Sequence, residues 1–155
     1  MINRYKQGIT IIETLVVIAV IAILVAVVIP QFANIRENQV LKSAVADVLS
    51  SINKARTQTL SSLNSSKYGV HFQSDKIIIF TGTGFLEESL DNETINITTP
   101  ATITNVTLNN VSGTSGDIYF NRLSGSPSKT GIITISTTSF SKIITISGTG
   151  VASSN

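Results

Sequence analysis

The sequence predicts an α+β fold in which one long helix packs on an antiparallel β-sheet. Two observations predict it. Residues 9–63 contain a single proline and no glycine, and their apolar side chains recur at helical spacing. From residue 64 onward the chain is rich in serine, threonine, isoleucine, valine and glycine in short alternating segments, which is typical of strands and turns. Because the strands follow the helix rather than alternate with it, an α/β fold is not expected.

Composition limits the functions open to this chain. Its 155 residues are about the size of one domain and include no cysteine, so neither a disulfide framework nor thiolate chemistry is expected. The 11 basic and 9 acidic residues give a net charge of +2. Two of the basic residues, Arg4 and Lys6, lie near the N-terminus, and the remaining 9 equal the acidic residues in number. A basic, nucleic-acid-binding surface is therefore not expected.

The segment 9–29 is long and apolar enough to cross a bilayer. Its 21 residues are interrupted only by Thr10, Glu13 and Thr14, and about 20 helical residues span the hydrocarbon layer. A cleaved secretory signal would have a shorter apolar core and a small-x-small cleavage site, neither of which is present. A membrane anchor fits the length, with the two N-terminal cations on the cytoplasmic side.

Glu13 is the residue that a simple anchor does not explain. A carboxylate at mid-membrane costs about 2.5–3.5 kcal/mol, and somewhat less near the edge. If the chain is cut after Gly8, Ile9 gains a free amine four residues before Glu13. The amine of one helix and the carboxylate of a neighbour could then neutralise each other inside an apolar bundle. Fixing the register between helices is the best-attested use of such buried pairs.

The N-terminal sequence KQG followed by ITIIETLVVIAVIAILVAVVIP resembles the leader and first helix of type IV pilins and type II secretion pseudopilins. That family has a short basic leader that ends in glycine, then an apolar helix with glutamate at the fifth mature position and proline at the twenty-second. Gly8, Glu13 and Pro30 occupy these places, while Ile9 replaces the commoner phenylalanine with another apolar residue. The competing interpretation is an unrelated anchor with a stray glutamate, which the rarity of intramembrane charges disfavours.

The resemblance implies a processing and assembly pathway. A prepilin peptidase would cut between Gly8 and Ile9 and methylate the new amine of Ile9, while Arg4 and Lys6 supply the leader charges. The subunit would lie in the bacterial inner membrane with its C-terminal domain outside the cytoplasm. An inner-membrane assembly platform would then move it from lipid into a filament of other pilin subunits, with Glu13 setting the register. No cofactor and no enzymatic activity are expected, because the sequence offers no set of catalytic partners for its single histidine.

Four segments are expected: a leader at 1–8, a transmembrane and polymerisation helix at 9–29, an amphipathic continuation at 30–63 and a β-rich domain at 64–155. Pro30 either ends the first helix or, as in the family, marks a kink in a helix that continues. Continuation is favoured because the following residues carry an apolar stripe. The stripe comprises Val40, Leu41, Ala44, Val45, Val48, Leu49, Ile52, Ala55, Leu60 and Leu63. One helix of about 55 residues is therefore expected.

Seven strands are expected in the C-terminal part. They cover residues 68–72, 76–81, 94–98, 103–108, 117–120, 131–136 and 142–147, with a tight turn at Ser74-Asp75 between the first two. Three segments, KARTQTL, IYFNRLSG and KIITISGTG, resemble the pattern of the GspH/FimT-like minor pilins and pseudopilins. A minor subunit that helps to prime assembly is thus the favoured role. A major filament subunit and a non-polymerising, membrane-anchored binding module are the alternatives.

Other candidate sites give weaker signals. His71 is the only histidine and lies in an expected strand, where a packed or surface residue is the commoner outcome. The two Gly-Thr-Gly triplets at 82–84 and 148–150 lack phosphate-loop spacing and are expected to be turns. The residues that could bind Ca²⁺ are Glu87, Glu88, Asp91 and Glu93, although a solvated loop is favoured. DNA binding is disfavoured because no lysine or arginine follows Lys142.

Overall fold

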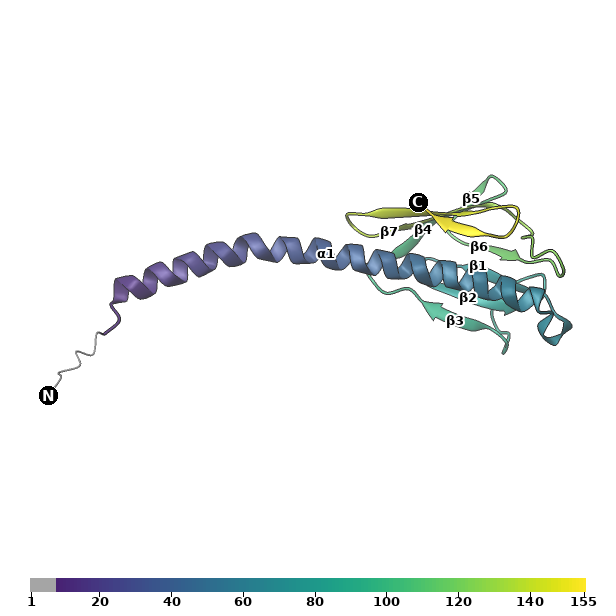
Figure 1. Ribbon diagram of the computed structural model, residues 1–155, viewed down its shortest axis with the longest axis horizontal. Coiled ribbons are helices and arrows are strands. Elements are labelled where there is room, and N and C mark those ends of the chain that lie inside the picture. Colours follow the sequence, from purple (N-terminus) through teal and green to yellow (C-terminus); the bar gives the residue numbers. More distant parts are fainter. Residues whose placement is uncertain (1–7) are drawn as a thin grey trace. The chain divides into compact units, whose positions relative to one another are not determined.

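The structure, a computed structural model, describes residues 8–155, apart from the side chains of Pro30 and Ala33. The leader cations Arg4 and Lys6 therefore lie outside the described residues. The chain divides into two units, of which the first ends at Arg36 and the second is Glu37–Asn155. Figure 1 shows the elements of both along the sequence.

Helix α1 spans Ile11–Leu60, 50 residues, and the helical assignment includes Pro30. The prediction of one long N-terminal helix is confirmed, although the helix ends three residues before the expected position. It ends there because Ser62 adopts the left-handed conformation at φ 51°, after which Leu63–Ser65 form a short 3-10 helix, η1. Within the described residues, α1 is the one helix long and apolar enough to cross a membrane.

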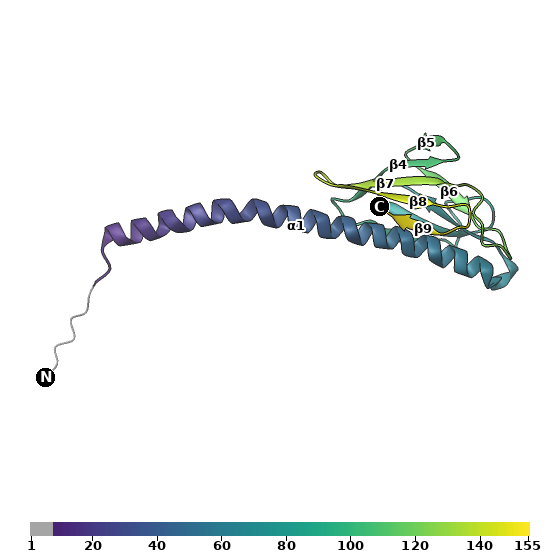
Figure 2. The same cartoon turned by 45° about the horizontal axis from the view of Figure 1, so that its top comes forward.

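The second unit contains two antiparallel sheets. A four-stranded sheet has the order β3-β2-β1-β6, and a five-stranded sheet has the order β5-β4-β7-β8-β9. Figure 2 shows the five-stranded sheet beside the C-terminal half of α1. The strands are β1 Tyr68–Phe72, β2 Lys76–Thr81, β3 Glu93–Asn96, β4 Thr102–Leu108, β5 Val111–Gly113, β6 Gly116–Tyr119, β7 Gly131–Ser136, β8 Ser141–Ile146 and β9 Ala152–Ser154. The α+β prediction is confirmed, but the expectation of a single sheet is wrong.

The chain changes sheet between β3 and β4. After β3 it passes the β1–β2 turn, where the amide of Ile97 donates to the carbonyl of Asp75 at 2.8 Å. The amide of Ile103, in β4, then donates to the carbonyl of Ser74 at 2.9 Å. These bonds occupy the turn and lead β4 away from β3, so β4 pairs with β5 and β7 instead. Local sequence patterns carry no such information about pairing.

Two strands were missed. The β4–β5 hairpin has the two-residue turn Asn109-Asn110, both at positive φ (47° and 65°), with Leu108 opposite Val111. Asparagine favours this conformation, so the Asn-Asn pair was the available signal. Strand β9 has only three residues, of sequence ASS, and no apolar alternation. It exists because it pairs antiparallel with β8.

A single apolar core joins the helix to both sheets. Leu41, Val48 and Ile52 of α1 are buried in one cluster with strand residues such as Val70 of the four-stranded sheet and Ile133 of the five-stranded sheet. The predicted stripe is correct for its first part but wrong at its end. Leu60 and Leu63 are 40% and 45% exposed, because α1 ends at Leu60 and the chain then turns toward β1. Two polar residues, Ser51 and Thr59, are buried instead.

Candidate functional site

The predicted cleavage site lies immediately before α1. Gly8, Ile9 and Thr10 precede the helix and are exposed. A Cβ atom built on Gly8 would meet no atom within 4 Å. Packing within the described chain therefore does not require glycine at this position. A requirement for glycine would come from a partner that approaches the backbone closely.

Thr10 caps the helix, a feature that sequence analysis missed. Its hydroxyl oxygen accepts a hydrogen bond from the amide of Glu13 at 3.3 Å. The hydroxyl of Thr14 donates to the carbonyl of Thr10, also at 3.3 Å. The signal was the spacing Thr-x-x-Glu, which is typical of a capping box. Glu13 therefore lies in the first helical turn, where its negative charge also interacts favourably with the helix dipole.

Glu13 is exposed in the single chain. Within residues 8–155, no basic side chain lies within ion-pair distance of its carboxylate. The side chains of Ile11, Ile12, Leu15 and Val16 around it are also exposed. An uncompensated carboxylate among apolar side chains needs either water or a partner from outside the described chain.

The apolar part of α1 has no cover of its own. Every residue from Ile11 to Ile29 is exposed, and nearly all of them are aliphatic. An apolar surface of this extent is not stable in water, so lipid or other helices must cover it. The helical assignment continues through Pro30, and the predicted kink at Pro30 remains a prediction.

The acidic residues considered for Ca²⁺ are divided between two places. Glu93 begins β3, and both of its carboxylate oxygens accept from Nζ of Lys54 in α1, at 2.5 and 2.6 Å. The other three, Glu87, Glu88 and Asp91, lie in the β2–β3 loop. Within residues 8–155, no group of three histidine, cysteine or acidic side chains is placed to bind a metal ion.

His71 is packed against an aromatic ring. It stacks on Phe85 with ring centroids 3.9 Å apart and an angle of 6° between the planes. Burial lowers the pKa of His71 from its usual value, and nearby Lys76 acts in the same direction, whereas Asp117 and Glu87 oppose the shift. The stack holds the β2–β3 loop on the outer face of the four-stranded sheet, so His71 has a structural contact there.

Arg56 brings together the three segments that resembled the GspH/FimT pattern. Its Nε donates to the carbonyl of Gly125 at 3.1 Å, and its Nη2 donates to the carbonyl of Thr149 at 3.2 Å. Arg56 belongs to KARTQTL, Gly125 to IYFNRLSG and Thr149 to KIITISGTG. One arginine of α1 therefore holds the β6–β7 and β8–β9 connections.

A family model described as the prokaryotic N-terminal methylation motif matches residues 3–29. The match covers the leader and the apolar helix, and it does not extend to residues 30–155. Searches of curated proteins and of solved structures found no match. Together with one long helix followed by antiparallel sheets, the motif supports a type IV pilin-like or pseudopilin subunit, a class of structural and non-enzymatic proteins. The GspH/FimT branch receives no support from this match.

Proposed function

We propose that this chain is a minor pilin or pseudopilin of the GspH/FimT type, a structural subunit of a type IV pilus or a type II secretion pseudopilus. It is made with a leader at residues 1–8 and inserted once into the bacterial inner membrane, with the β-rich domain outside the cytoplasm. Prepilin peptidase removes the leader, and the assembly platform transfers the mature subunit from lipid to the filament. There it contacts other subunits through the helix at residues 9–29 and helps to prime assembly.

One observation carries this proposal: the methylation motif at residues 3–29 coincides with an uncovered apolar helix that contains a carboxylate. Lipid alone would explain the apolar side chains but not Glu13. A neighbouring subunit with a free amine at Ile9 supplies the missing positive charge. We expect this pair to select one axial register among otherwise similar apolar contacts.

Processing is tested by mass spectrometry of the mature protein from its native host. The expected N-terminus is Ile9, with a mass increase for one methyl group on the amine. An intact Met1 terminus, or a cut beyond Ile29, would contradict the proposal and would favour a membrane-anchored module that does not polymerise.

The role of Glu13 is tested by two substitutions with a matched control. Glu13→Ala should leave membrane insertion intact and reduce recovery in the filament fraction, because the amine of the neighbour loses its counter-charge. Glu13→Gln keeps the capping-box geometry but removes the charge, so it should fail as Glu13→Ala does. Thr14→Ala, on the next position of the same helix, should assemble normally. Normal assembly of Glu13→Gln would show that capping, and not charge, is what the helix requires.

A major filament-forming subunit is the second candidate function. It uses the same processing and the same pair between Ile9 and Glu13, but it requires contacts that repeat between identical copies. The lysine-flanked groove beside α1 and the exposed acidic loop before β3 favour this candidate.

A further inference from the structure

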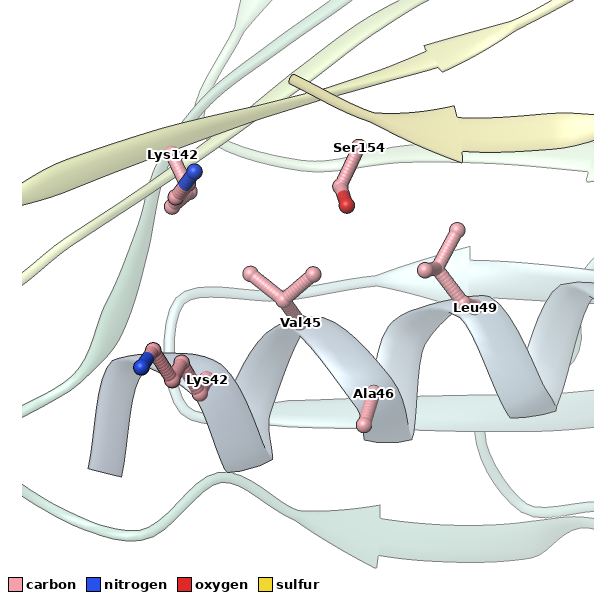
Figure 3. Close-up of a pocket in the computed structure, with 6 residues that line it drawn as sticks. All are labelled: Lys42, Val45, Ala46, Leu49, Lys142 and Ser154. Carbon is pink, nitrogen blue, oxygen red and sulfur yellow. The ribbon is translucent and has the colours of Figure 1, made fainter. Parts of the chain in front are cut away.

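An apolar groove lies between α1 and the edge of the five-stranded sheet (Figure 3). It has a volume of about 270 Å³ and is lined by Lys42, Val45, Ala46, Leu49, Lys142 and Ser154. Val45 and Leu49 point from the helix toward β8 and β9, while Lys142 and Ser154 point back toward the helix. Ser154, on the last strand, has a short side chain that leaves space between β9 and the helix.

The groove is positively charged at one end. Lys42 on the helix and Lys142 on β8 lie on opposite sides of that end, and both are exposed. In the described part of the chain, no carboxylate lies within ion-pair distance of either ammonium group. The nearby carboxylate of Glu37 accepts a hydrogen bond from the amide of Ser139 at 3.1 Å. The groove therefore favours an occupant that combines an apolar side chain with carboxylates.

The β2–β3 loop of the same chain has that chemistry. Residues 86–91 have the sequence LEESLD. Leu86 is 72% exposed and Leu90 is fully exposed. None of the carboxylates of Glu87, Glu88 and Asp91 forms an ion pair within residues 8–155. Two exposed leucines among three free carboxylates form a surface that complements the groove in both polarity and charge.

Contacts within the chain hold both ends of this loop. Phe85 stacks on His71, which fixes the start of the loop to the sheet. The side-chain amide of Asn92 donates to the carbonyls of Leu86 at 2.7 Å and Glu87 at 3.2 Å, which fixes its end. A loop that is already ordered loses little conformational entropy when it binds.

We propose that residues 86–91 of one copy of this chain dock in the groove of a second copy. Leu90 would contact Val45 and Leu49, and the loop carboxylates would lie beside the two lysines. The proposal rests on the second candidate function, the filament-forming subunit, because the second copy is taken to be an identical neighbour in the filament.

The loop cannot occupy the groove of its own chain. The groove belongs to α1 and the five-stranded sheet, whereas the loop covers the outer face of the four-stranded sheet. Figure 1 shows β3 and β7 on opposite sides of α1. The two surfaces are also displaced along the helix, since Glu93 at the end of the loop pairs with Lys54, beyond the groove residues 42–49.

This displacement determines the kind of assembly. Lys54, which pairs with Glu93 just after the loop, is eight to nine residues beyond the middle of the groove, so this end of the loop lies roughly 13 Å farther along the helix axis at 1.5 Å per residue. Two copies with parallel helices would therefore be offset along the axis when a loop docks in a groove. The contact joins two different surfaces, so it leaves a free loop and a free groove at the ends and can repeat without closing.

Disulfide cross-linking tests the contact, since the natural chain contains no cysteine. The full-length chain with Ala46→Cys and Leu90→Cys, in detergent micelles under mild oxidation, should form a ladder of dimers, trimers and larger species. The matched control places the first cysteine at Thr57 on the exposed side of α1, and it should form at least tenfold less dimer. No excess over this control would overturn the proposal. Dimers from Leu90→Cys alone would also overturn it, because they indicate a symmetric loop–loop contact.

Exchanging the charges of the groove and the loop tests whether their ion pairs determine the contact. Lys42→Glu with Lys142→Glu should lower the 46–90 cross-link roughly twofold to thirtyfold, the range for two exposed ion pairs. Glu87→Lys with Glu88→Lys on the loop partner should restore it, and failure to restore it would contradict the assigned charge pairing. Cross-linking in micelles does not require cleavage at Gly8. An absent cross-link with normal processing would overturn this inference alone, and absent processing with a normal cross-link would overturn the proposed function alone.

Discussion

Thr59 connects the end of α1 to the start of the four-stranded sheet, and its removal should be costly. The side chain is fully buried. Its hydroxyl accepts a hydrogen bond from the amide of Tyr68, the first residue of β1, at 2.9 Å, and donates to the carbonyl of Ala55 at 2.9 Å. The single hydroxyl therefore satisfies a backbone amide that would otherwise be buried without a partner.

Thr59→Val removes the hydroxyl and keeps both the volume and the branching of the side chain. The amide of Tyr68 then loses its acceptor, which costs about 1–3 kcal/mol of unfolding free energy for a buried group. Thr57→Val is the matched control, because Thr57 lies on the same helix but is exposed. That change should alter stability by less than about 0.5 kcal/mol. Thr59→Ser keeps the hydroxyl and should recover most of the loss.

The assay is pulse proteolysis across a urea series on the full-length chain in detergent, which reports the unfolding free energy of the β-rich domain. The wild type, Thr57→Val and Thr59→Ser should all have a higher unfolding free energy than Thr59→Val. Stability of Thr59→Val within 0.5 kcal/mol of Thr57→Val would refute this prediction, because the amide of Tyr68 must then have another acceptor.

Three further predictions use the same assay. Arg56→Ala should cost roughly 1–2 kcal/mol because two loop carbonyls lose a charged donor, whereas Lys54→Ala should cost at most about 1 kcal/mol; equal losses would contradict the role of Arg56. Gly150→Ala should cost roughly 2 kcal/mol or more, because φ is +80° and the new Cβ would lie 2.2 Å from a carbonyl oxygen. Gly148→Ala, with no atom within 4 Å, should not. Burial lowers the pKa of His71, so the unfolded state binds the proton more readily. Stability should therefore fall as pH drops below about 6.5, and His71→Gln should reduce this fall.

Local patterns predicted most elements because each signal lies within a few residues. The predicted bounds of β1, β2 and β7 agree with the structure, and those of β3, β4, β6 and β8 differ by one or two residues. Strands β1, β2, β7 and β8 contain isoleucine, valine or phenylalanine at alternate positions and are followed by glycine or polar residues. Strand β9 lacked that pattern because it is an edge strand stabilised by backbone pairing with β8.

The partition into two sheets could not be read from the same patterns. Both sheets contribute to one core, so their inward residues look alike in sequence. The two sheets separate after β3, where the amides of Ile97 and Ile103 donate hydrogen bonds to the carbonyls of Asp75 and Ser74. The turn at Ser74-Asp75 is visible in the local sequence, but its second set of hydrogen-bond partners lies more than 20 residues away and leaves no local signal.

The two candidate interaction surfaces also differ in how far apart their residues lie in the sequence. The N-terminal signal is contiguous: cleavage position, carboxylate and apolar span lie within 30 residues, so their chemistry is visible in the sequence. The groove combines Lys42 with Lys142, which are 100 positions apart and come together only when β8 packs beside α1. The apolar helix alone could slide between equivalent packings. A loop-to-groove contact would add a second register constraint, separate from the one proposed at Glu13. The two proposed contacts lie in different units of the chain, so substitutions at Glu13 and in the groove should affect assembly separately.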